Sequence, residues 1–474
     1  MKRETKILIV LFVFALLIRI LFSFSSPVKW WDETVYSNLG YGLSKNPLDY
    51  SFANCGWSDF IGDNMWPKAG FRAPLLPYTL AIFYFLKLEF LIDFLMPLIG
   101  ALSVIFTYLL GKRLFNSKIG IYSALFLSFL PLHIYFSGKI LTDVFSTFFI
   151  LLSILCFWKG YEQNEKPYKL VFGFLLALTV LSRYTALWII PSFFIYLVIK
   201  NKSLKFLKDK SLWQAFVIFL LTLLPWFVYS FFTYGNPLGA FIHGSKAASY
   251  WGGSQPWYFF FQHSPEIFSV VGILFIFSLI YIIIKKEFKR KEIYFLLFWI
   301  FLFLFMAILM PHKEERFLLP ILPAVCILGS FFLDRLKIKF NYKITFIIII
   351  LFLLSLFIFF YFERIYKDSY TDENDCFLKG NAFLRNTSLD SVIITGDSPI
   401  TYYYTKRETR FYPNVWSIDS IKNLVSSYKN REVYIFFSNT KTDLMEREKQ
   451  DLDSNFQKVF DCRNSTLIYY FNNL

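Results

Sequence analysis

The sequence of 474 residues is poor in the residues from which soluble metal and redox centres are built. Its five cysteines lie far apart without a CxxC pair, and its four histidines show no paired metal spacing. A GxGxxG run, a Walker loop and a Ser/His/Asp arrangement are all missing. These absences exclude a disulfide-framed mini-protein, and soluble nucleotide chemistry has no visible site.

Apolar residues, by contrast, make up 56% of the chain, against roughly 45–50% in soluble domains. They are grouped in long runs that are separated by short basic loops. This grouping is typical of a polytopic membrane protein, and it excludes a soluble enzyme, a collagen and a mostly disordered chain.

Eleven segments are apolar enough to be predicted as membrane-spanning helices, since about 20 apolar residues cross a bilayer. They are 7–24, 90–110, 119–136, 143–158, 168–182, 184–200, 212–232, 266–284, 292–310, 317–333 and 344–362. The apolar stretch 74–88 is short, and we interpret it as interfacial or re-entrant, because a spanning helix there would break the alternation of the loops. The predicted fold class is therefore an α-helical polytopic membrane protein.

The positive charge of the chain is concentrated in the predicted loops. The formal net charge is +15, and six short loops hold 23 of the 49 Lys and Arg residues. The eleven-span scheme puts all six loops on one side, as the positive-inside rule expects of cytoplasmic loops. We therefore predict a protein of the cell membrane with a cytoplasmic N-terminus, and no nucleic acid as a partner.

The last 112 residues change in character, with 15 basic and 16 acidic side chains. We predict a second domain at 363–474, outside the membrane on the extracytoplasmic side, after a membrane domain at 1–362. The strands predicted in it are 392–395, 433–437 and 467–471, and the helices are 417–428 and 442–452, which makes a small α/β or α+β domain. Cys376 and Cys462 share this domain and could form a disulfide on an oxidising side.

The first group of ionisable residues follows the first span, in Trp30-Trp31-Asp32-Glu33-Thr34-Val35-Tyr36. One interpretation is an interfacial helix that runs to about Leu43 and has Asp32 as its N-cap. The other is a general base that accepts a proton from an attacking hydroxyl. The two are compatible, and the sequence does not say whether Asp32 or Glu33 takes the proton.

A second carboxylate, Asp143, opens a span on the same predicted outer side as Asp32. One interpretation is again a helix N-cap. The other is a functional group, because burying a carboxylate at the end of a span costs free energy.

The third group is Pro311-His312-Lys313-Glu314-Glu315-Arg316-Phe317, on the side that the positive-inside rule leaves poor in Lys and Arg. It is either a solvated turn or a phosphate-recognition site, since Arg binds two phosphate oxygens and Lys supplies a point charge. Isolated cations on the same side are Lys68, Arg72 and Arg183. Each alone is explained as an interfacial snorkelling residue, but as a set they suit a lipid-phosphate head group.

Together these residues resemble the GT-C superfamily of membrane glycosyltransferases, which use lipid-phosphate-linked sugars. Asp32-Glu33 looks like its acidic motif, and Phe71-Arg72-Ala73-Pro74-Leu75-Leu76-Pro77-Tyr78 is similar to the basic-Pro-Leu motif of the protein O-mannosyltransferase and aminoarabinose-transferase branch. Segments 181–187 and 225–237 also resemble that branch. The segment from His312 to Phe317 instead resembles the late-loop motif of Alg9/PIG-B-type mannosyltransferases. The resemblance spans about residues 30–325.

The resemblance implies transfer of a sugar, mannose or a related hexose, from a polyprenyl- or dolichyl-phosphate donor to an acceptor hydroxyl at the outer membrane face. The acceptor would be a glycan, a lipid or a protein, and the surrounding membrane lipids are the other partners. Together with the residues themselves, it implies Asp32 as general base, Glu33 as its support, and Asp143 as the residue that orients a substrate or holds a divalent ion if one is needed. The residues expected to bind the donor phosphate are Lys68, Arg72, Arg183, His312, Lys313 and Arg316. Those expected to position substrate are Tyr36, Glu314 and Glu315. No cofactor is required and no metal site is predicted, because no nucleotide leaves.

Three alternatives remain open from the sequence. A lipid-linked sugar transporter would be expected to show polar residues at mid-span and repeated halves, whereas these spans are nearly free of charge at their centres and no halves repeat. An oligosaccharyltransferase or glycan ligase would share the fold. A receptor or scaffold would act through the C-terminal domain.

Overall fold

The computed structural model describes residues 3–24, 28–52, 55, 69–250, 253–336, 355, 372–413, 417–438 and 446–472. Contacts divide the chain into two compact units. The helical unit comprises Met1–Phe24, Gly70–Leu76 and Glu89–Tyr366, and the sheet unit comprises Ser25–Ala69, Pro77–Leu88 and Lys367–Leu474. The domain boundary predicted at 362/363 falls outside the described residues.

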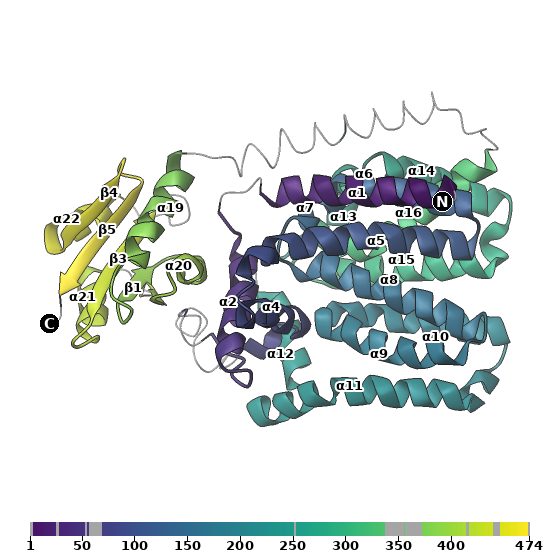
Figure 1. Ribbon diagram of the computed structural model, residues 1–474, viewed down its shortest axis with the longest axis horizontal. Helices are drawn as coiled ribbons and strands as arrows, with labels where there is room; N and C mark the ends of the chain where they lie inside the picture. The colour runs from purple at the N-terminus through teal and green to yellow at the C-terminus, as the bar shows by residue number, and fades with distance from the viewer. Residues whose placement is uncertain are drawn as a thin grey trace. The chain divides into compact units, whose positions relative to one another are not determined.

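The helical unit is a bundle of helices joined by short loops (Figure 1). In chain order its helices are α1 Arg3–Ser23, η2 Glu89–Leu91, α5 Ile92–Leu114, α6 Ser117–Phe129, α7 Pro131–Ser137, α8 Thr142–Tyr161, α9 Lys166–Ser182, η3 Tyr184–Ile189, α10 Ile190–Asn201, η4 Leu204–Lys208, α11 Lys210–Tyr234, α12 Gly239–Tyr250, α13 Phe259–Gln262, α14 Ser264–Ile284, η5 Glu287–Lys289, α15 Lys291–Leu309, η6 Glu315–Ile321 and α16 Leu322–Arg335. Helices α1, α5, α8, α9 and α11 pack side by side in that order.

The described helices account for ten of the eleven predicted spans. Eight are long and apolar enough to cross a membrane, or nine if the bent pair α6 and α7 is one span. The 17-residue α9 covers the predicted span 168–182. The span predicted at 344–362 lies outside the described residues, so the total of eleven is not confirmed. Helix α4, Leu75–Phe85, has 11 residues and is shorter than a membrane crossing, which fits the interfacial or re-entrant interpretation of 74–88.

The span predicted at 119–136 is not one straight helix, because α6 and α7 meet at an angle of 63°. Pro131 has no N–H to donate to the preceding turn, and Leu130 before it has an extended backbone, with φ −69° and ψ 114°. Helix α6 therefore ends at Phe129, and α7 begins with Pro131 at its first position, where a proline is tolerated.

The loops rich in Lys and Arg meet at one end of the helical unit, which we call the basic end. The ion pairs between them are Lys112–Glu4, Lys118–Asp334, Lys169–Asp209, Lys200–Glu162 and Lys291–Glu162. Glu162 thereby joins its own loop to two others. The predicted gathering of the basic loops is confirmed for the described residues, whereas Lys337, Lys339 and Lys343 lie outside them.

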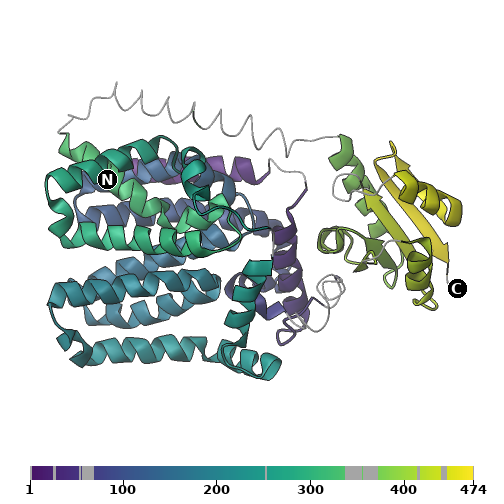
Figure 2. The ribbon, with the colours of Figure 1, turned by 180° about the vertical axis from the view of Figure 1, so that it is seen from behind.

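The sheet unit contains a five-stranded mixed sheet with the strand order β2-β1-β3-β5-β4 (Figure 2). Its elements are α19 Asp372–Arg385, β1 Val392–Thr395, α20 Ser398–Thr405, β2 Glu408–Phe411, α21 Ile418–Ser426, β3 Glu432–Ser438, α22 Glu446–Asn455, β4 Gln457–Cys462 and β5 Thr466–Asn472. Strand β1 is parallel to β2 and β3, and β5 is antiparallel to β3 and β4. The three predicted strands coincide with β1, β3 and β5, and β2 and β4 were not predicted.

Helices cover both faces of this sheet, because successive residues of a strand point to opposite faces. Ile393 of β1 packs against residues of α19 and α20, and Ile394 packs against residues of α21 and α22. Cys376 of α19 and Cys462 of β4 form a disulfide with a Cα–Cα distance of 5.5 Å. The pairing that the sequence allowed is therefore present in the structure.

The helix after the first span, α2 Trp31–Lys45, packs in the sheet unit against α20. The side-chain amide of Asn38 donates to the carbonyl of Pro399 at 2.8 Å. The ring of Trp31 stacks on Phe411, with 5.9 Å between the ring centroids. The region that carries Asp32 is thus held by the C-terminal domain through side-chain contacts.

Candidate functional site

Asp143, Arg183 and Arg316 come together at the end of the helical unit opposite to the basic end. The Asp143 side chain is 2% exposed, and Arg183 Nη1 lies 2.7 Å from its Oδ1. Arg316 Nη1 lies 4.0 Å from its Oδ2. A buried carboxylate is costly unless cations or hydrogen-bond donors compensate it, and here two guanidiniums face one carboxylate.

The N-cap interpretation of Asp143 is wrong. Helix α8 begins at Thr142 and its N-cap is Leu141, so Asp143 is the second helical residue. Its backbone carbonyl accepts hydrogen bonds from the hydroxyls of Ser146 and Thr147 inside the helix. The carboxylate itself faces the two guanidiniums.

Arg183 lies at the junction between α9 and η3, and its side chain is fixed by several partners. Its Nη1 donates to Thr142 Oγ1 and its Nε donates to Thr185 Oγ1, both at 3.1 Å. The guanidinium also lies over the ring of Phe317, 5.3 Å from the centroid. Within the described part of the chain Nη2 has no hydrogen-bond acceptor, and the side chain is 21% exposed. Arg183 can therefore offer donors to an anion without giving up its present contacts.

Arg316 is oriented by its neighbours in the same loop. Its Nη2 donates to Glu314 Oε1 at 2.7 Å, while its side chain is 12% exposed. The same carboxylate oxygen lies 3.0 Å from His312 Nε2. Glu314 and His312 thus hold the guanidinium in the position from which Nη1 faces Asp143.

Lys313 lies between these residues in sequence but makes different contacts. Its side chain is buried, and its ammonium donates to the carbonyls of Gln255 and Met310 at 2.9 and 2.6 Å. The Lys313 N–H donates to Gln255 Oε1, and the Gln255 N–H donates to the carbonyl of Pro311. Burial lowers the pKa of Lys313. Through these contacts Lys313 joins its loop to Gln255. The binding of phosphate by Lys313 stays a prediction.

The segment that contains Arg72 is tied to η3 and α11 through Tyr184. The Tyr184 hydroxyl donates to the carbonyl of Gly70 at 2.7 Å and accepts from Trp226 Nε1 at 2.9 Å. The guanidinium of Arg72 lies 5.5 Å from the ring centroid of Phe71. Three of the segments that resembled one family in the sequence are therefore in contact in the helical unit.

Among the residues that the structure describes, one group has the geometry to hold a metal ion. His263 Nδ1 lies 3.4 Å from Glu266 Oε2 and 3.5 Å from Glu315 Oε1, and the three ligand atoms are within 4.8 Å of one another. All three side chains are partly exposed. A histidine nitrogen and two carboxylates are a donor set that suits Zn²⁺, but the same contacts also fit an imidazolium between two carboxylates. Glu315, predicted to position substrate, lies in this group.

Asp32, Glu33 and Tyr36 belong to the sheet unit and lie in the first two turns of α2. Asp32 is not the N-cap, because the helix begins at Trp31 and its N-cap is Trp30. Glu33 Oε2 accepts the N–H of Trp30 at 2.9 Å, so it is Glu33 that satisfies a backbone donor at the helix start. Glu33 and Tyr36 are buried, and Asp32 is half-buried. Lys68 lies outside the described residues.

Arg19, which is not among the predicted site residues, is completely buried in α1. Its Nη2 lies 2.9 Å from His133 Nδ1 and donates to the carbonyl of Leu127 at 3.1 Å, and its Nε donates to Ser137 Oγ. These partners lie on both sides of the break between α6 and α7. A cation within an apolar span is the signal that could have found it.

The fold and the cluster of carboxylates and guanidiniums define the class of the molecule as a multi-pass membrane protein with a GT-C-like fold. Residues 71–229 match the family described as dolichyl-phosphate-mannose-protein mannosyltransferase. This stretch contains Arg72, Asp143 and Arg183.

Two curated relatives match parts of the chain. An uncharacterized protein of Aquifex aeolicus is 30% identical over 256 residues, which cover 52% of this chain and 49% of the relative. GPI mannosyltransferase 3 of Saccharomyces cerevisiae is 28% identical over 232 residues, which cover 41% of this chain and 36% of the relative. The chain thus spans about half of the length of the first of these relatives and about a third of the second.

Solved structures match nearly the whole chain. ArnT from Cupriavidus metallidurans in the apo state has a TM-score of 0.74 at 11% identity, covering 100% of this chain and 99% of that one. The same protein bound to undecaprenyl phosphate has a TM-score of 0.74 at 12% identity and covers 98% of both chains. The Archaeoglobus fulgidus oligosaccharyltransferase in its apo form has a TM-score of 0.63 at 13% identity and covers 98% of this chain and 74% of that one.

These likenesses confirm the predicted GT-C-like fold of a helical membrane body with a small C-terminal sheet domain. With the family match and the mannosyltransferase relative, they also confirm the resemblance to the GT-C superfamily.

Proposed function

We propose that this protein transfers a sugar, mannose or a related hexose, from a polyprenyl- or dolichyl-phosphate donor to an acceptor hydroxyl at the outer face of the membrane. The observation that carries the proposal is the pair of guanidiniums, Arg183 and Arg316, held beside the buried carboxylate of Asp143. Guanidinium is the side-chain group whose geometry matches two phosphate oxygens. The outer face is assigned because the basic loops, which the positive-inside rule places in the cytoplasm, lie at the opposite end.

The donor phosphate is expected to bind against Arg183 and Arg316. Asp143 and Glu314 compensate the two guanidiniums and hold them in place, so that they are already oriented for a phosphate. A protein of similar fold, ArnT, has been solved with undecaprenyl phosphate, which supports a lipid phosphate as the ligand here.

In the proposed reaction the acceptor oxygen attacks the anomeric carbon and gives its proton to Asp32. The bond between the anomeric carbon and the phosphate oxygen breaks, and its electron pair stays on the phosphate as the sugar configuration inverts. The two guanidiniums stabilise the charge that develops on the leaving phosphate. No metal is required for this step, because the leaving group is a lipid phosphate that the arginines can stabilise.

The contacts divide the loop 312–316 between two roles in this proposal. Glu314 and His312 orient Arg316, whereas Lys313 fixes the loop through Gln255 and Met310. We therefore assign the direct phosphate contact to Arg316 and a supporting contact to His312. Arg72 is proposed as a further phosphate ligand, and Tyr36 and Glu315 as residues that position substrate.

The test is release of lipid phosphate by the purified full-length protein from polyprenyl-phosphate mannose that is labelled in the sugar. We expect the wild type to release lipid phosphate and to transfer label to an acceptor mixture of lipids and glycans. Asp32→Asn is expected to abolish both, because the variant cannot take the acceptor proton. The matched control is Glu89→Gln, an exposed carboxylate at the same end of α5 as the site, which is expected to keep full activity.

The result that would contradict the proposal is an Asp32→Asn variant with wild-type transfer. A second contradictory result is movement of the labelled donor across proteoliposomes without cleavage, which would support a lipid-linked sugar transporter. Transfer from another hexose donor but not from the mannose donor would retain the reaction type and correct the sugar.

A further inference from the structure

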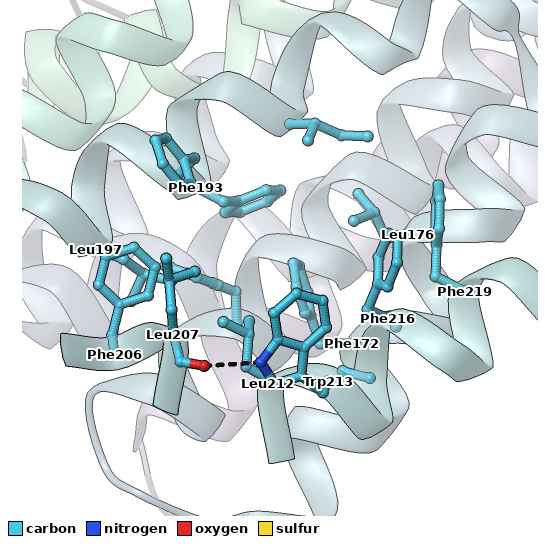
Figure 3. Close-up of a pocket in the computed structure, with 15 residues that line it drawn as sticks. Phe172, Leu176, Phe193, Leu197, Phe206, Leu207, Leu212, Trp213, Phe216 and Phe219 are labelled. Atoms are coloured by element: carbon cyan, nitrogen blue, oxygen red, sulfur yellow. Dashed lines mark hydrogen bonds between the residues drawn. The ribbon is translucent and has the colours of Figure 1, made fainter. Parts of the chain in front are cut away.

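A hollow lies between four helices of the helical unit, towards their basic ends (Figure 3). Its volume is about 360 Å³, and every side chain in its wall is apolar or aromatic. The labelled side chains come from α9, α10, η4 and α11 and surround the space. Phe157 of α8, fourteen residues after Asp143, completes the wall, so the hollow is about 20 Å along α8 from the candidate site.

The shape of this hollow, which we call the groove from here on, is fixed by close packing at its floor. A Cβ on Gly173 of α9 would lie 2.1 Å from the carbonyl oxygen of Ala215 in α11, so only glycine lets the two helices approach this closely. Helix α10 lies away from this contact and leaves the space open between them. The groove is therefore built by backbone packing.

The loop between α10 and α11 closes the basic end of the groove. Phe206 packs edge-on against Phe194, with ring centroids 5.9 Å apart. The indole N–H of Trp213 donates to the carbonyl of Leu207 at 2.7 Å and fixes η4 over the hollow (Figure 3). The end wall of the groove is thus an ordered part of the fold.

The same loop carries four exposed lysines interleaved with the wall residues. They are Lys202, Lys205, Lys208 and Lys210. Within the described residues none of them has a carboxylate at ion-pair distance, whereas Lys200 is paired with Glu162. An apolar hollow that is bordered by unpaired cations at the membrane surface has the charge complement of a lipid with a negative head group.

We propose that this groove binds an anionic membrane phospholipid, with its acyl chains in the apolar hollow and its phosphate on the four lysines. The apolar wall favours the chains, and each lysine near the surface adds to the attraction for a negative head group. The proposal is independent of the proposed function, because the groove shares no residue with the candidate site.

The donor lipid is the less favoured occupant. Its phosphate belongs at the opposite end of the bundle in the proposed function, and the four lysines would then have no phosphate to bind. A phospholipid of the leaflet at the basic end can place its acyl chains in the apolar hollow and its phosphate on the four lysines at the same time.

The experiment is native mass spectrometry of the full chain, delipidated and then incorporated in nanodiscs of phosphatidylglycerol and phosphatidylcholine in equal parts. We expect the wild type to retain one phosphatidylglycerol in preference to phosphatidylcholine. The variant with Lys202→Gln, Lys205→Gln, Lys208→Gln and Lys210→Gln is expected to lose this preference at least tenfold. Leu207→Trp, which fills the groove and keeps every lysine, is expected to lose the bound lipid.

The control variant is Lys285→Gln, Lys286→Gln and Lys289→Gln, because that loop is equally basic and contributes no residue to the groove. It is expected to retain the phosphatidylglycerol. Equal loss in the control, retention in Leu207→Trp, or no preference in the wild type would each overturn the proposal. So would displacement of the phosphatidylglycerol by undecaprenyl phosphate at equal concentration, which would make the donor chain the occupant. An unchanged thermal unfolding midpoint shows that each variant is folded.

Discussion

The pair formed by Asp143 and Arg183 allows a test that separates a structural role from a catalytic one. Their closest atoms are 2.7 Å apart, and the side chains are 2% and 21% exposed. Removing one partner of a buried ion pair leaves an uncompensated charge and costs roughly 3–5 kcal/mol. Arg183 is partly exposed and Arg316 also faces Asp143, so we expect a loss of about 2 kcal/mol for Arg183→Gln, below that range.

The double variant Asp143→Asn/Arg183→Gln removes both charges and leaves an uncharged amide at each position. Its stability is expected to return to near that of the wild type, because two amides can hydrogen-bond to each other and neither is a buried charge. Its transfer activity is expected to stay about 100–1,000-fold below the wild type, because the phosphate has lost a preorganised cation. Arg183→Lys is expected to recover only part of the activity, since an ammonium cannot bind Thr142, Thr185 and a phosphate in the geometry of the guanidinium.

The assays are the thermal unfolding midpoint in detergent and the initial rate of lipid-phosphate release, measured on the same preparations. Arg113→Gln at the basic end, where the guanidinium contacts Gln163, is the control for loss of one arginine and is expected to change neither quantity appreciably. If the double variant regains both stability and activity, the pair is structural and the assignment of Arg183 to the donor phosphate is refuted.

Further predictions concern metal ions, the disulfide and pH. Chelation with EDTA and the His263→Ala substitution are each expected to leave the release rate within about twofold, and a larger loss with rescue by Zn²⁺ would show that this group holds a required metal. Reduction of the bond between Cys376 and Cys462, which are 86 residues apart, is expected to lower the free energy of unfolding of the sheet unit by roughly 4–5 kcal/mol from loop-closure entropy, measured by denaturant unfolding of the full chain; Cys376→Ser should be insensitive to reductant. The hydrogen bond from Lys458 lowers the pKa of Asp453, so its stabilisation is present above about pH 4 and is lost as the pH falls through the folded-state pKa. Because both groups are exposed, Asp453→Asn should flatten the pH dependence of the unfolding midpoint by less than about 1 kcal/mol, and an unchanged profile would show that the bond contributes nothing.

The helical part of the fold could be predicted from sequence because its signals are local. A run of apolar residues and a basic loop are each visible within one segment, and the ten described spans coincide with helices. The break at Pro131 was also visible in principle, since a proline within an apolar run disfavours a continuous helix. The strands β2 and β4 were not predicted, because Glu408–Phe411 and Gln457–Cys462 are rich in polar residues and carry no β-branched or apolar run.

The sequence predicted which residues belong to the candidate site and that they lie on the same side of the membrane. It did not predict which of them contact one another. The choice of Arg183 as the partner of Asp143 depends on how α8 packs against α9, which no local pattern records. The N-cap interpretations failed by two residues at both Asp32 and Asp143, and a shift of this size decides whether a carboxylate binds a backbone N–H or faces another side chain. The burial of Lys313 against two carbonyls depends on Gln255, which lies in a separate loop.

Arg19 is a residue at which a local sequence signal and a tertiary contact depend on each other. The end of α6 at Phe129 leaves carbonyl groups of its last turn without intrahelical donors, and Arg19 donates to the carbonyl of Leu127, while its guanidinium also contacts His133 and Ser137 of α7. A cation at the C-terminal end of a helix is also favoured by the helix dipole. The polar groups exposed at the break between α6 and α7 thus stabilise the buried guanidinium of Arg19. In return, the guanidinium supplies hydrogen-bond donors to the two helices that meet at the break. Residues 138–141 join α7 directly to Thr142 and Asp143. The buried contacts of Arg19 therefore help to fix the position of Asp143, the acidic partner of Arg183.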